Sequence, residues 1–189
     1  MELRNTVIVD TETTGLDKAA EVCEISIIDG HTGLTLLDTL IRPTRPISPG
    51  AEKVHGISDA MVADAPTWAD IHGVVCRLLT GTTVIIYQQE FDLRLMKQSA
   101  RANDCRLPQL DSACAMLWLH DFLKTRTDPN PKWPKLTEAA DMFGVTPQGT
   151  AHRALCDAIM TRDVLLAVRE TDQLDRLCLE STETHDDPV

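Results

Sequence analysis

The chain has 189 residues and a mass of 20.9 kDa, which is the size of one domain. Hydrophobic residues make up 43% and charged residues 25%, so the composition excludes a globally disordered chain. No apolar run approaches the roughly 20 residues of a membrane helix, and the N-terminal apolar run is too short for a signal peptide. We therefore expect a soluble, cytoplasmic protein with no membrane partner.

The charge is negative overall but unevenly distributed. The formal net charge is −11, from 18 basic and 29 acidic residues, which argues against a strongly basic nucleic-acid coat protein. Residues 170–189 hold seven acidic residues and one basic residue, whereas Arg94–Lys135 hold eight basic and four acidic residues. An acidic protein with one basic sector is compatible with a local nucleic-acid site. Six scattered cysteines without a Cys-x-x-Cys pair argue against zinc.

Strand-like runs dominate the first part of the chain. Arg4–Val9 is a short apolar run that ends at Asp10 and predicts a buried strand. The runs Val22–Ile28 and Leu34–Ile41 flank a five-residue connection with two glycines, which predicts an antiparallel hairpin. Three prolines make Arg42–Pro49 extended rather than helical.

Helices and strands alternate further along the chain. A capping-box pattern between Thr67 and Asp70 predicts the start of a helix, and apolar residues follow at helical spacing. Val84–Tyr87 is a short apolar run that predicts a strand, followed by a helix from about Glu90 to Ala102. Arg106–Leu110 is our candidate for a fifth strand.

Three more helices complete the pattern. Asp111 or Ser112 is the expected cap of the first, Lys135–Phe143 forms the second, and Arg153–Arg169 forms the last. Beyond it the acidic residues lack periodicity and are expected to fray. Strands first, followed by alternating helices and strands, predict an α/β layer architecture with a mixed sheet.

Two carboxylates at the end of the first strand are out of place. Asp10 and Glu12 point to the same side of a strand, and two like charges at the edge of a core repel unless a cation neutralises them. A plain strand-to-turn transition is the alternative. Asp92 lies in the first turn of its helix, where an acid also simply complements the helix dipole.

Asp157 and His152 form a second unusual pair. Asp157 shares a helix face with apolar residues, and a buried aspartate is rare without a partner. His152 is five residues earlier, so the two side chains converge only if the histidine lies on a loop before the helix. A histidine there suits proton transfer, although an exposed loop histidine without a role is the commoner case. Four carboxylates from separate segments suit Mg²⁺ or Mn²⁺ better than zinc.

These residues fall within three motifs. Asp10–Leu16, Tyr87–Asp92 and His152–Asp157 resemble the three motifs of the DEDDh family of 3′–5′ exonucleases, which includes proofreading epsilon and exonuclease X-like enzymes. Ile41–Pro49 and Val54–Ile57 are similar to the exonuclease X-like members in particular. The resemblance implies a ribonuclease-H-like fold, with a mixed sheet of about five strands flanked by helices.

The resemblance covers roughly residues 4–168. We therefore expect residues 1–170 to form a DEDDh exonuclease domain and residues 171–189 an acidic C-terminal tail.

The resemblance also implies roles for single residues. It implies that two Mg²⁺ or Mn²⁺ ions are held by Asp10, Glu12, Asp92 and Asp157, with His152 as general base. It implies that the terminal nucleotide contacts Thr13, Gly15, Leu16, His55, Gln88 and Phe91. The second motif usually has Asn where this chain has Gln88, and His55 is otherwise an ordinary polar residue of a turn.

The implied activity is metal-dependent 3′–5′ release of nucleoside 5′-monophosphates from DNA ends, with single strands favoured. The implied partners are nucleic acid and a DNA polymerase or another replication or repair protein. Two alternatives stay open: an exoribonuclease with the same residues, and a nucleic-acid or polymerase-binding module that has lost catalysis. The intact five-residue set argues against the second.

One further segment has a nucleic-acid pattern. Lys132–Lys135 alternates basic and aromatic residues, which can bind phosphates and stack a base. A single loop tryptophan that covers the core is the alternative.

Overall fold

The computed structural model describes residues 3–126, 129–149 and 152–183, of which 173–183 are described by backbone only. Its elements in chain order are β1 (Thr6–Thr13), β2 (Val22–Asp29), β3 (Thr35–Leu40), α1 (Pro49–His55), α2 (Asp59–Val62), α3 (Trp68–Leu79), β4 (Thr83–Ile86), α4 (Gln89–Ala102), β5 (Asp111–Cys114), α5 (Ala115–Arg126), α6 (Leu136–Met142) and α7 (Ala154–Glu183).

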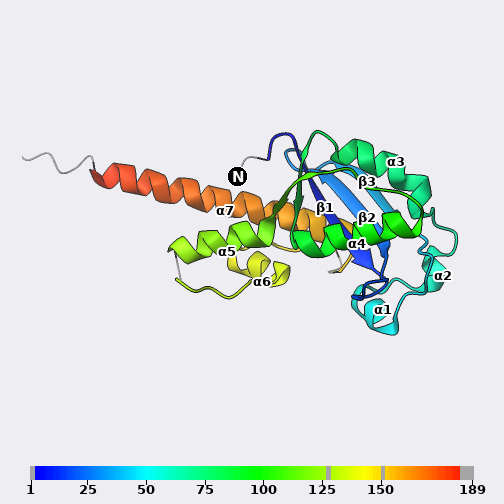
Figure 1. Ribbon diagram of the computed structural model, residues 1–189. Helices are drawn as coiled ribbons and strands as arrows, with labels where there is room; N and C mark the ends of the chain where they lie inside the picture. Colours follow the sequence, from blue (N-terminus) through cyan, green and yellow to red (C-terminus); the bar gives the residue numbers. More distant parts are fainter. Residues whose placement is uncertain (1–2, 127–128, 150–151, 184–189) are drawn as a thin grey trace, which may run out of the picture.

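The sheet has five strands in the order β3-β2-β1-β4-β5 (Figure 1). β1, β2 and β3 pair antiparallel, whereas β4 is parallel to β1 and β5 is parallel to β4. The predicted mixed sheet with an antiparallel first part is therefore confirmed. Val9, paired with Ile86, is the last residue of β1 that pairs with β4, and β1 continues for four residues beyond it. In this final part β1 pairs with β2 alone, which leaves its β4 side open to other elements.

Strand alternation divides the core into two layers. Val7 and Val9 of β1 pack in one apolar cluster with α3 and α4, whereas Ile8 packs in another with α5 and α7. Figure 1 shows this arrangement: α7 lies on the opposite face of the sheet from α3 and α4. The same alternation continues past Val9, so it decides which helix layer each later side chain of β1 faces.

The fifth strand is not where the sequence pattern placed it. The strand is Asp111–Cys114, and the predicted segment Arg106–Leu110 is a connection without regular structure. Asp111 and Ser112 therefore lie in the strand and are not caps of α5. The strand forms because its backbone pairs with β4, and Thr83 Oγ1 donates to Asp111 Oδ2 over 2.7 Å. Such pairing overrides a polar sequence.

Two other boundaries differ from expectation. Pro49 is not extended but begins α1, because proline suits the first helical position and Ser48 Oγ accepts the N–H of Ala51 as an N-cap. The last helix does not end near Arg169 but extends to Glu183. The added segment contains Leu, Arg and Glu, which favour helix.

The five cysteines in the described part of the chain are free thiols, of which only Cys23 is fully buried. Among the residues that the structure describes, no helix combines the length and apolarity that crossing a membrane requires.

Candidate active site

The last part of β1 carries the first two acidic side chains. Asp10 and Glu12 continue the alternation of Ile8, so both face the α7 layer, whereas Thr11 faces α4. Both acidic residues stay within the ladder with β2, where Asp10 is paired with Ser26 and Glu12 with Glu24. The strand therefore runs through these residues instead of turning at them.

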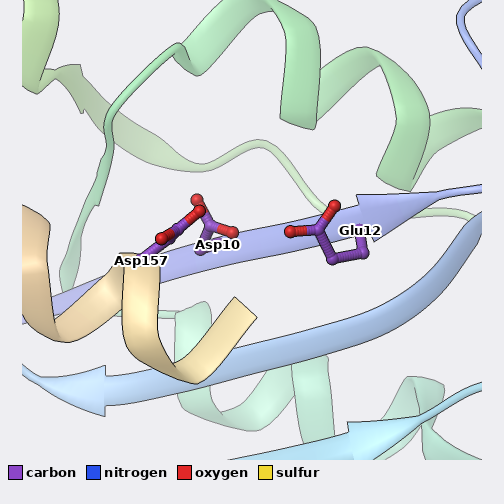
Figure 2. A group of neighbouring side chains, drawn as sticks. All are labelled: Asp10, Glu12 and Asp157. Atoms are coloured by element: carbon purple, nitrogen blue, oxygen red, sulfur yellow. The ribbon is translucent and has the colours of Figure 1, made fainter. Parts of the chain in front are cut away.

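Asp157 joins them from the first turn of α7. Carboxylate oxygens of Asp10, Glu12 and Asp157 all lie within 4.8 Å of one another. Figure 2 shows the two side chains of β1 and that of α7 directed toward one another. We refer to these three residues as the carboxylate cluster. Sequence spacing predicted that Asp10 and Glu12 share a face, and the fold adds the aspartate from a helix about 145 residues away in the chain.

The cluster is electrostatically strained. Burial, and then the charges of Asp92, Asp157 and Glu12, hold the pKa of the Asp10 carboxyl well above its ordinary value. Burial raises the pKa of Glu12 to about 8, with Asp157 as the next cause. Burial also raises the pKa of Asp157. Ionised oxygen ligands at this spacing are stabilised by a hard divalent cation, so the donor set fits Mg²⁺ or Mn²⁺.

The fourth carboxylate, Asp92, lies on the other side of β1. It is 5% exposed in the first turn of α4, as the sequence placed it, and its Oδ1 accepts the hydroxyl of Thr11 over 2.7 Å. Burial raises the pKa of Asp92 to about 7, although the Thr11 hydrogen bond opposes the shift. Asp92 is not among the three residues within 4.8 Å, but its charge acts on Asp10. The structure therefore brings three of the four acids together and places the fourth beside them.

His152 lies on the loop before α7, as its spacing from Asp157 predicted. Its backbone has φ of 60°, a left-handed conformation that is uncommon outside glycine, and its side chain is exposed. The charge of the imidazole and the backbone N–H of His152 both oppose the upward shift in the pKa of Asp157. An exposed histidine is thus held next to the partly buried carboxylate of Asp157. This contact distinguishes His152 from an exposed loop histidine without a role.

Sequence reasoning missed Glu24, which is 3% exposed on β2. The Nε of Arg153 donates to both of its carboxylate oxygens, at 3.0 and 3.1 Å, and the backbone N–H of Ala154 donates to Glu24 Oε2 over 2.9 Å. Ala154 is the first residue of α7, so Glu24 both pairs with the preceding arginine and caps the helix. The contacts fix the segment between His152 and Asp157. The sequence did carry one signal for this role, since Glu24 is a charged residue inside the apolar run Val22–Ile28.

Several residues predicted to contact the nucleotide lie on the α4 side of the cluster. Leu16 is 77% exposed, and Thr13 Oγ1 donates to the carbonyl of Gly15 over 3.0 Å. The Arg94 guanidinium lies 5.3 Å from the ring centre of Phe91 and donates to the carbonyl of Leu16 over 3.4 Å. Leu16 and Phe91 are therefore neighbours through Arg94, which the sequence had placed only in a basic sector.

His55 is buried rather than open to a ligand. Its Nδ1 accepts the N–H of Ile57 over 3.0 Å, so Nε2 carries the proton and donates to the carbonyl of Thr13 over 3.1 Å. Burial lowers the pKa of His55, which favours this neutral form. The side chain therefore braces the backbone at Thr13, and the predicted contact of His55 with a nucleotide stays a prediction.

A pocket of about 470 Å³ adjoins the cluster at Asp157. It is lined by Tyr87, Gln88, Met116, Trp133, Pro134, Lys135, Leu136, Thr137, His152 and Asp157. Gln88 of the second motif thus lies in this pocket, apart from Leu16 and Phe91. The loop Trp133–Lys135 is brought to the same pocket as His152 and Asp157.

Comparison with known proteins identifies the family of the chain. Residues 7–165 match the family described as Exonuclease. The chain is 42% identical over 172 residues to an uncharacterized exonuclease of Escherichia phage 186, a match that covers 86% of this chain and 87% of that protein. It is 30% identical over 168 residues to exodeoxyribonuclease 10 of Escherichia coli K12, covering 87% of this chain and 68% of that protein.

A solved structure is also similar over most of the chain. Exonuclease X in complex with 5′-overhanging duplex DNA aligns with a TM-score of 0.64 at 30% identity, over 88% of this chain and 92% of that one. The family match spans all three motifs, and the fold brings together the acidic residues Asp10, Glu12 and Asp157 of the first and third motifs. The chain belongs to the exonuclease family and is a 3′–5′ exonuclease of the DEDDh type.

Proposed function

We propose that this exonuclease removes nucleoside 5′-monophosphates from the 3′ ends of single-stranded DNA, using two Mg²⁺ or Mn²⁺ ions held by Asp10, Glu12, Asp157 and Asp92. The observation that carries the proposal is the convergence of the carboxylate cluster within 4.8 Å beside an exposed histidine. A DNA substrate is supported by the names of two relatives, an exodeoxyribonuclease and a DNA-bound exonuclease X.

When bound at these carboxylates, divalent cations would stabilise charge on the attacking and leaving oxygens of the phosphodiester. His152 takes a proton from the attacking water, because imidazole is the side chain that exchanges protons most readily near neutral pH. Its exposure leaves the ring accessible to that water, and the link to Asp157 keeps it beside the reacting phosphate.

The α4 side of the cluster holds the terminal nucleotide in this proposal. Leu16 and Phe91 offer apolar surfaces to the base and sugar, and Arg94 keeps them together. His55 fixes the carbonyl of Thr13, so it acts on the nucleotide through the backbone. Relatives named as the epsilon subunit of DNA polymerase III support a further proposal, that a polymerase is a partner.

The direct test is release of labelled mononucleotides from matched DNA and RNA strands in Mg²⁺. We expect the parent to degrade single-stranded DNA from the 3′ end. His152→Ala should lose about 10²- to 10⁴-fold in turnover while it still binds metal and strand, since a general base contributes to the rate and not to ligation. His31→Ala, in the exposed turn between β2 and β3, is the matched control and should behave as the parent.

Three outcomes contradict this scheme in different ways. Faster degradation of RNA would identify an exoribonuclease. Strand binding without release would identify a module without catalysis. Parent-like turnover of His152→Ala would exclude the histidine as the base.

The raised pKa values predict how the stability of the metal-free protein depends on pH. Glu12 titrates near 8 in the folded chain against 4.5 ordinarily, and Asp92 near 7 against 3.8. At a pH between the ordinary and the raised pKa of each group, the folded chain holds a proton that the unfolded chain has lost. The free energy of unfolding therefore falls as pH rises through this range. We expect the melting temperature in chelator to be lower at about pH 8 than at about pH 5.

Saturating Mn²⁺ should raise the melting temperature at pH 8 and reduce that difference, because the cation binds the folded, ionised cluster only. Glu12→Gln should flatten the pH dependence in chelator, since it removes a titrating group. A melting temperature in chelator that rises over this pH range, or no response to Mn²⁺, is incompatible with the carboxylate cluster as described.

Glu24 provides a separate prediction about positioning. Glu24→Gln keeps an oxygen for the N–H of Ala154 but removes the charge that holds Arg153. We expect kcat to fall about tenfold or more with KM little changed, because small displacements of catalytic groups are costly. Glu52→Gln, on the exposed side of α1, is the matched control and should match the parent. A parent-like kcat for Glu24→Gln would show that the pair with Arg153 does not position the site.

A further inference from the structure

Trp133 is exposed on one side and supported on the other. Its side chain is 53% exposed, whereas Trp68, which fills the core, is 1% exposed. The indole stacks on the ring of His120 from α5, with ring centres 3.9 Å apart and planes 14° from parallel. One face of the indole is therefore covered by a flat partner, and half of the side chain is still open to solvent. The exposed face of the indole is therefore available to a flat ligand.

The loop that carries Trp133 is fixed to the second exonuclease motif. The Tyr87 hydroxyl donates to the carbonyl of Pro134 over 2.8 Å, and Pro134 is buried. On the next residue, Lys135, the backbone N–H donates to Glu138 Oε2 over 3.0 Å at the start of α6. These bonds hold the indole at a set position relative to Tyr87 before any ligand binds. A pre-positioned ring loses little conformational entropy on binding.

The indole shares a pocket with the catalytic residues. Trp133 and Lys135 line the same pocket of about 470 Å³ as His152 and Asp157. The residues that line the pocket therefore include an aromatic and a basic residue together with the proposed base and a carboxylate of the cluster. A flat base with an attached phosphate matches this combination, since the ring stacks on the base and the cation meets the phosphate.

The position of the pocket identifies which nucleotide it takes. In the proposed function the terminal nucleotide lies on the α4 side of the cluster, next to Leu16 and Phe91. The pocket is separate from those two residues: residues of α5, α6 and α7 line it together with Tyr87 and Gln88, and neither Leu16 nor Phe91 does. A strand whose scissile phosphate lies at the carboxylate cluster continues there from the terminal nucleotide to the penultimate one. The pocket adjoins the cluster at Asp157 but excludes the residues assigned to the terminal nucleotide, so it receives the nucleotide on the 5′ side of that phosphate.

We propose that Trp133, supported by His120, is the stacking platform for the base of the penultimate nucleotide, and that Lys135 contacts a phosphate beside it. This inference rests on the proposed function, because it takes the position of the scissile phosphate from it. Stacking on an indole uses the π-face that every base has, so the subsite accepts all four bases with little preference.

The test uses single-stranded DNA in which one nucleotide at a time is abasic: the terminal, the penultimate or the third from the 3′ end. The ratio kcat/KM for release of the first nucleotide is measured for the parent, Trp133→Ala and Trp133→Phe. Met142→Ala is the matched control, because Met142 is 55% exposed on α6 and does not line the pocket. Melting temperatures of all variants confirm that they are folded.

For the parent, we expect the penultimate abasic nucleotide to lower kcat/KM about tenfold, as loss of one stacked base does. On intact DNA, Trp133→Ala should lower kcat/KM by about the same factor. With the penultimate abasic strand it should show no further loss, because two changes that remove the same direct contact are not additive. Trp133→Phe should keep most of the activity and the sensitivity. The terminal abasic strand should affect parent and Trp133→Ala equally, and Met142→Ala should match the parent throughout.

An equal penultimate penalty in the parent and in Trp133→Ala would overturn the proposal, and Trp133 would then only cover His120. Coupling of Trp133 to the third nucleotide instead would overturn the assignment to the penultimate base. A parent that releases no nucleotide from intact DNA would refute the proposed function itself, and the subsite with it. A parent that is active but shows no coupling refutes the subsite alone.

Discussion

Three carboxylates held within 4.8 Å at a largely buried point cannot all be ionised without a positive counter-charge, and the organisation of the site follows from this constraint. Two of them come from one strand, where alternation puts Asp10 and Glu12 on one face. The third requires the first turn of α7 to lie against that strand. Burial first, and then the neighbouring carboxylate charges, raise the pKa values of Asp10 and Glu12. A divalent cation removes that conflict, and the donor set is of the kind such ions prefer.

The chain has a cation close by, but that cation is already engaged. Arg153 lowers the pKa of Glu12 only as the last of its causes, after burial and three acidic neighbours. Its guanidinium is paired with Glu24, which also caps α7 through Ala154. The pair thus anchors the helix that carries Asp157 and leaves the negative potential of the cluster available to a metal. The same anchor lies next to His152, so the positions of the proposed metal ligand Asp157 and of the proposed base depend on one interaction.

Much of the site could be predicted from the sequence because it depends on short-range periodicity. A period of two places Asp10 and Glu12 on one face, and the five-residue spacing from Asp157 requires His152 to precede the helix. Glu24 was missed because its run of apolar neighbours indicates only a buried strand, and its partner is 129 residues away. The stack of Trp133 on His120 was missed for another reason, since it forms only because the connection from α5 to α6 folds back onto α5. β5 was misplaced because its pairing with β4, and not its composition, makes it a strand.

The central claim is that the carboxylate cluster together with Asp92 binds two divalent cations. The most direct measurement is a crystal structure of the parent grown with Mn²⁺ and a nucleoside 5′-monophosphate, with the ions located by anomalous scattering. The account predicts two Mn²⁺ ions about 4 Å apart. Their ligands are expected to include oxygens of Asp10, Glu12, Asp92 and Asp157. No anomalous signal among these four residues at saturating Mn²⁺, or ions bound only elsewhere, would contradict it.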